Sequence, residues 1–136
     1  MRRFGPPPSA DEIEAIARVT LAALPAAFRD SLGDIIFSIE EFADAATLRD
    51  MGIDDPFDLS GLYEGIPLTE RSVEGQSGIL SDSILIYREG ILAMATDRRG
   101  RTNETELQRQ IRITILHELG HHFGMTEDDL AELGYD

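Results

Sequence analysis

The chain of 136 residues is long enough for one domain with a hydrophobic core and short for two. Hydrophobic residues make up 42% and charged residues 28% of it, ordinary proportions that argue against wholesale disorder. The formal net charge of −14 argues against nucleic acid or anionic membranes as partners and mildly favours neutral or cationic ones, although solubility alone is the commoner reason for such a charge.

The chemistry must come from a restricted set of side chains, because the sequence contains no cysteine. Disulfides, thiolate nucleophiles and cysteine zinc sites are thereby excluded. The chain starts with two arginines but no apolar stretch behind them, and no apolar run long enough to span a membrane follows. We therefore expect a cytoplasmic protein.

A proline-rich lead-in, residues 1–9, precedes the first predicted helix. Ser9 and Glu12 form a capping box, which satisfies free backbone amides at a helix start near residue 10. Pro25 ends or kinks this helix, and residues 25–32 can resume as a short one.

The middle of the chain is less regular. Alternating apolar residues predict a half-buried strand within 34–42, and residues 43–52 favour a short helix that ends at a glycine. Residues 53–82 are rich in Gly, Pro, Asp and Ser, which predicts loops with one short strand around 61–63.

The last third predicts a strand followed by helices. Residues 83–90 are dense in Ile and Tyr, which favours a strand, and residues 91–97 favour a short helix. The final elements are a long helix over 106–123, capped by Thr102 or Asn103 and ended by Gly124, and a last helix over 127–135, begun by a Thr126–Asp129 capping box.

All three histidines lie in the stretch HELGHHFGMTEDDL, residues 117–130. His117 and His121 are four residues apart on the long helix, so their rings point the same way, a spacing that suits two imidazole nitrogens on one zinc ion. Glu118 lies beside that pair, where it can take a proton from metal-bound water. This is the HExxH pattern, and coincidental histidines on a helix surface are the alternative.

The helical wheel supports a metal site on one face of the long helix. The polar sector contains Gln110, Thr114, His117, Glu118 and His121, whereas Ile111, Ile115, Leu116, Leu119 and Phe123 spread over the opposite side. His122 falls between Ile111 and Ile115, which favours a partly buried structural histidine over a catalytic one.

A third ligand can only be a carboxylate, because no histidine or cysteine remains. Gly124 lets the chain reverse, and Glu127, Asp128 and Asp129 follow. Asp129 already has a role in the capping box. Favourable charge at a helix start explains all three acids without a metal, so the residues alone leave the ligand open.

HELGHHFGMTE, residues 117–127, resembles the extended zinc motif of metzincin-type metallopeptidases, HExxHxxGxx followed by a third ligand. That resemblance puts Glu127 in the third place, where metzincins have His and some relatives have Asp, with Asp128 as the alternative. GLYEGIPLTER, SILIYREG, RQIRITILHELGHHFG and DDLAELGY are similar to the small bacterial family of minimal zincin-like, or minimal matrix-metalloprotease-like, proteins.

The resemblance implies an α+β fold, a small zincin-like single domain over residues 10–136 with a short mixed sheet packed on a long metal-binding helix. It also implies one Zn2+ ion and peptidase chemistry on an unidentified peptide or protein substrate. His117, His121 and Glu127 would hold the ion, and Glu118 would move the water proton to the leaving amine.

Several alternatives accompany this hypothesis. A non-catalytic, metal-stabilised acidic binding module is one, and hydrolysis of a non-peptide amide or ester is another. The strand over 83–90 either offers an edge to an extended substrate or lies inside the sheet. Tyr87 and Tyr135 are candidate donors to a tetrahedral oxyanion, with packing as their other role.

Overall fold

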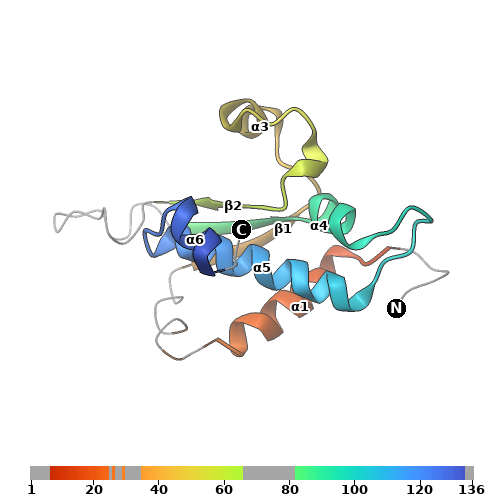
Figure 1. Ribbon diagram of the computed structural model, residues 1–136, viewed down its shortest axis with the longest axis horizontal. Helices are drawn as coiled ribbons and strands as arrows, with labels where there is room; N and C mark the ends of the chain where they lie inside the picture. Colours follow the sequence, from red (N-terminus) through yellow and green to blue (C-terminus); the bar gives the residue numbers. More distant parts are fainter. Residues whose placement is uncertain (1–6, 25, 27–28, 30–34, 66–81, 134–136) are drawn as a thin grey trace.

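The computed structural model describes residues 7–24, 26, 29, 35–65 and 82–133, and Figure 1 shows their arrangement. Three strands within these ranges form a sheet in the order β1-β3-β2. The elements are α1 (Ala10–Ala22), β1 (Ile35–Glu40), α3 (Ala45–Met51), the 3-10 turn η1 (Pro56–Asp58), β2 (Gly61–Glu64), β3 (Asp82–Tyr87), α4 (Arg88–Ala95), α5 (Glu104–His122) and α6 (Glu127–Leu133). The fold is a small α+β domain, as the sequence predicted.

The sheet is mixed, because its middle strand has one neighbour of each kind. β3 runs parallel to β1 and antiparallel to β2. α1 and α5 cover one face of the sheet (Figure 1). Ile84 and Ile86 of β3 are fully buried, as expected for the inward positions of a strand with period two.

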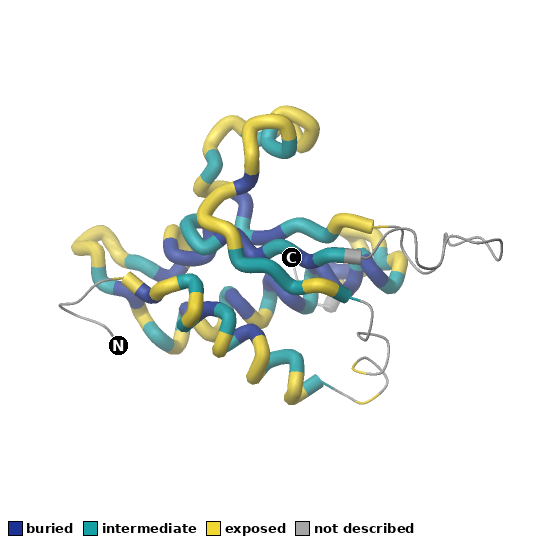
Figure 2. Tube along the Cα trace, turned by 180° about the vertical axis from the view of Figure 1, so that it is seen from behind, coloured by how far each residue is buried: buried dark blue, intermediate teal, exposed yellow. Residues whose placement is uncertain are grey.

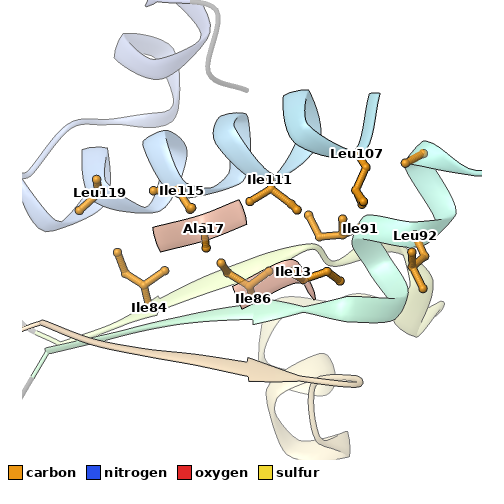
Figure 3. Close-up of a cluster of buried hydrophobic side chains, with 11 residues drawn as sticks. Ile13, Ala17, Ile84, Ile86, Ile91, Leu92, Leu107, Ile111, Ile115 and Leu119 are labelled. Atoms are coloured by element: carbon orange, nitrogen blue, oxygen red, sulfur yellow. The ribbon is translucent and has the colours of Figure 1, made fainter. Parts of the chain in front are cut away.

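The main core lies between this sheet face and the long helix (Figure 3). Successive turns of α5 contribute Leu107, Ile111, Ile115 and Leu119, each at most 3% exposed. Burying a side chain of this size stabilises the fold by about 1.5–3 kcal/mol. The repeat of four residues leaves the opposite side of α5 free for polar groups.

A smaller cluster covers the other face of the sheet, around Ala43, Leu59 and Tyr87. Above it α3 stands away from the rest of the domain (Figure 1). No residue of α3 is buried, and most of this segment is coloured as exposed in Figure 2. Gly52 ends α3 in the left-handed conformation at φ 69°, which confirms the predicted stop.

The local start signals in the sequence are confirmed. Ser9 and Glu12 form the predicted capping box of α1. Asn103, rather than Thr102, caps the long helix, since its side chain accepts the amide proton of Glu106 at 3.1 Å. The predicted short helix over 25–32 falls largely outside the described residues.

The predicted strand over 83–90 was too long, because β3 ends at Tyr87 and α4 begins at Arg88. The ladder stops there because β1 ends at Glu40, the partner of Tyr87. Arg88 is then held by hydrogen bonds to the Pro8 carbonyl and the Glu41 carboxylate, both 2.7 Å long. In addition, β3 is the inner strand, so the idea that it offers an edge to substrate was wrong.

No helix among the described ranges is both long and apolar enough to cross a membrane.

Candidate metal centre

The long helix α5 brings His117, Glu118 and His121 to a cavity of about 740 Å³. Gln110 and Thr114 also line this cavity, which confirms the predicted polar sector. One nitrogen or carboxylate oxygen from each of His117, Glu118 and His121 lies within 4.8 Å of the others. The apolar side of the same helix anchors these groups to the core.

The imidazole rings of His117 and His121 lie close together on one side of α5. The Nε2 atoms of His117 and His121 are 3.2 Å apart, and the rings meet edge to face at 75°. Two nitrogens bound tetrahedrally to one zinc ion at about 2.0–2.1 Å would be about 3.3 Å apart. The observed separation therefore fits a shared ion.

Glu127 completes the cluster from the next helix. Its Oε1 lies 2.9 Å from Nε2 of His121, and its Oε2 lies 3.3 Å from Nε2 of His117. Gly124 turns the chain with φ 82°, and the amide of Met125 donates to the Gly120 carbonyl at 2.8 Å. This turn carries the first residue of α6 back over the histidines.

The neighbouring acids have other surroundings. Asp129 accepts the amide proton of Thr126 at 3.0 Å, while its own amide donates to the Thr126 hydroxyl at 3.2 Å, so the predicted capping box is present. Asp128 is exposed in the first turn of α6. Of these three acids, Glu127 contacts both imidazole rings.

The Glu118 side chain is buried, at 10% exposure, whereas the Glu127 side chain is 70% exposed. Its Oε2 lies 3.9 Å from Nε2 of His117. Burial raises the pKa of Glu118 above its ordinary value, while the two histidines and the Tyr63 amide, which donates to the carboxylate, act in the opposite direction. Glu118 is therefore a buried carboxyl group beside two candidate metal ligands, and its pKa is raised.

Strand β2 lies directly against the part of α5 that bears Glu118. A Cβ atom on Gly61 would be 2.5 Å from Cγ2 of Thr114 and 3.5 Å from Cγ of Glu118. The Thr114 hydroxyl donates to the Ser60 hydroxyl at 3.2 Å. Sequence reasoning missed these contacts, although a glycine within a predicted strand is a known sign of close backbone approach.

His122 has the burial expected of a structural histidine. It is 2% exposed, and its ring packs edge to face on Tyr63 and Phe123 with centroid distances of 5.7 and 5.3 Å. Its Nδ1 lies 3.4 Å from the Tyr63 hydroxyl.

Of the two tyrosines considered as oxyanion donors, Tyr87 is 2% exposed within the cluster on the far sheet face. Burial, with a smaller effect of nearby carboxylates led by Glu64, raises the pKa of Tyr87 to about 12. This buried environment favours a packing role for Tyr87 over the role of an oxyanion donor. Tyr135 lies outside the described residues.

The fold and the site together define a small α+β domain with a candidate metal site on an HExxH helix. A family model described as zincin-like metallopeptidase matches residues 32–135. The chain therefore belongs to the zincin-like metallopeptidase family. No match was found among curated proteins.

Proposed function

We propose that the protein is a zinc-dependent hydrolase that cleaves peptide bonds. His117, His121 and Glu127 hold the ion in this proposal, and Glu118 is the general base. The convergence of two imidazole nitrogens and the Glu127 carboxylate, with contacts of 2.9–3.3 Å, is the observation that supports it. Family membership supports the same chemistry.

The mechanism gives each residue one task. Zinc in a site with three protein ligands acts as a Lewis acid and brings the pKa of water towards 7. The Glu118 carboxylate accepts a proton from the attacking water and returns it to the leaving amine. The Tyr63 amide orients Glu118, because its hydrogen bond fixes one edge of the carboxylate.

The substrate in this proposal is a peptide or protein rather than nucleic acid or a membrane. The net charge of −14 supports this choice, since phosphate groups would be repelled.

The test is the substitution Glu118→Gln in zinc-loaded protein, with Glu14→Gln on α1 as the matched surface control. Zinc content is measured by elemental analysis, and cleavage of a broad peptide library by mass spectrometry. We expect one zinc ion per chain in every form and a loss of cleavage of about a hundred- to ten-thousand-fold in Glu118→Gln alone. Undiminished cleavage in Glu118→Gln would refute the general-base assignment.

A non-catalytic, metal-stabilised module is the second candidate. It is favoured by one observation, that Glu127 belongs to α6 while both histidines belong to α5, so that a bound ion would tie two helices together. Absence of zinc-dependent cleavage of every peptide, together with a lower melting temperature after chelation, would support this module instead.

A further inference from the structure

Methionine side chains form much of the apolar wall of the cavity that His117, Glu118 and His121 line. The sequence contains four methionines, and all three that follow the first residue, Met51, Met94 and Met125, line this one cavity. They come from three separate segments: α3, α4 and the turn after α5.

Two of these methionines are unusually exposed for apolar side chains. Met51 is 45% and Met94 is 44% exposed. Exposed apolar groups that border a polar site commonly mark a surface that a ligand covers. A thioether side chain is unbranched and polarisable, so it adapts to apolar groups of different shapes.

Apart from the two histidines, the ionisable side chains with ordinary charges at neutral pH that line the cavity are acidic. Among the described residues that line it, the charged side chains are Asp58, Glu118 and Glu127, and none is an arginine. If Glu118 and Glu127 are occupied in proton transfer and metal binding, Asp58 remains for contact with a ligand. A bound Zn2+ ion would offset the charges of Glu118 and Glu127, so Asp58 is the lining carboxylate that would attract basic side chains and repel acidic ones.

From these observations we propose that the cavity selects polypeptide segments in which a large apolar side chain lies close to a basic residue. Met51 and Met94 are the residues that determine apolar specificity, and Asp58 determines the preference for positive charge. The inference rests on the proposed function in taking the ligand to be a polypeptide. Because methionine adapts, leucine, methionine and phenylalanine should be accepted about equally.

The test measures binding rather than cleavage. Short Gly/Ser-based peptides with a central leucine and a nearby lysine are labelled, and their affinity for zinc-loaded Glu118→Gln protein is measured by fluorescence anisotropy. Replacing the leucine by alanine, or the lysine by glutamate, should each weaken binding about tenfold. Central methionine or phenylalanine should bind within about threefold of leucine.

Substitutions in the cavity wall test which residues cause the preference for leucine and for lysine. Met51→Ala and Met94→Ala should each weaken binding of the leucine peptide about three- to tenfold. Ile36→Ala is the control, because Ile36 is also an exposed apolar residue, at 53%, and lies on β1, the strand farthest from β2. Asp58→Asn should reduce the preference for lysine over glutamate, whereas Asp54→Asn, an exposed neighbour outside the cavity lining, should not.

Equal binding of the leucine and alanine peptides, or of the lysine and glutamate peptides, would overturn the inference, and so would equal effects of Met94→Ala and Ile36→Ala. Cleavage of the library is measured in parallel with unsubstituted protein. Selective binding without cleavage would reject the peptidase proposal and keep the inference. Cleavage without selective binding would keep the peptidase proposal and reject the inference.

Discussion

Glu127 and Asp128 are adjacent in the sequence, and only their side-chain directions separate the two candidate ligands. Because the Glu127 carboxylate contacts both imidazoles, we expect Glu127→Gln to lower zinc affinity by about a hundredfold or more, beyond the ten- to hundredfold typical of residues that only orient a ligand. Asp128→Asn removes the same charge and should change affinity little. Competition with a chromophoric chelator measures both. A larger effect of Asp128→Asn would transfer the ligand role to Asp128.

Gly61 is required by the close contact between β2 and α5. In Gly61→Ala the new Cβ would be 2.5 Å from Cγ2 of Thr114, closer than real contacts allow. We expect the free energy of unfolding to fall by about 1–3 kcal/mol, measured by urea denaturation.

The rescue variant for this clash is Gly61→Ala combined with Thr114→Ser. Serine lacks the obstructing methyl group but keeps the hydroxyl that donates to Ser60. The double variant should therefore be more stable than Gly61→Ala. Additive losses would show that the clash is not the cause.

At the scale of elements, the start of α6 positions a proposed metal ligand. Thr126 and Asp129 cap this helix, and Glu127 is its first residue. Thr126→Ala should destabilise the first turn by about 1 kcal/mol and weaken zinc binding several-fold, although Thr126 itself is not a proposed ligand.

Ser9→Ala is the matched control for that variant, because Ser9 caps α1, which bears none of the proposed ligands. We expect a similar loss of stability in thermal unfolding, with zinc affinity unchanged. If Ser9→Ala and Thr126→Ala weaken zinc binding equally, the effect is one of global stability.

The features that the sequence predicted well are local ones. Ser9 with Glu12, Thr126 with Asp129, and His117 with His121 all act over three or four residues, so short spacing rules describe them. The end of β3 at Tyr87 was mispredicted because it depends on where β1 stops pairing, and β1 lies more than forty residues earlier in the chain.

Prediction of the site is also limited to contacts within one segment, because contacts between distant segments leave no local pattern in the sequence. His117, Glu118 and His121 were placed from one helical pattern, and all three line the cavity. The amide of Tyr63 that contacts Glu118 belongs to a strand some fifty residues away, and no periodicity reveals which strand lies against which turn of a helix. The third-ligand assignment to Glu127 remains a proposal.

At the scale of the whole molecule, alkaline stability should depend on Tyr87. Its pKa is raised to about 12 in the folded state, above the ordinary value of 10.0, because the buried phenol is held neutral. A raised folded pKa contributes stability that is fully present below pH 10 and is lost as the pH rises towards 12. We expect the free energy of unfolding to fall by up to about 2 kcal/mol in this window.

Tyr87→Phe tests this dependence by urea denaturation between pH 9 and 12, with phenolate absorbance followed in parallel. The sequence contains no lysine, so tyrosines dominate titration in this range. The variant should lose most of the decline seen in the parent protein. An unchanged decline would mean that another group causes it.

The position of β3 between β1 and β2 affects how the protein is made. Both outer strands precede β3 in the chain and pair only with it in the described sheet. On the ribosome, the first two strands therefore emerge without a partner. A nascent chain that ends before residue 82 should therefore contain no part of this sheet. Once β3 has emerged from the ribosome, β1 and β2 should pair with it in a single cooperative event.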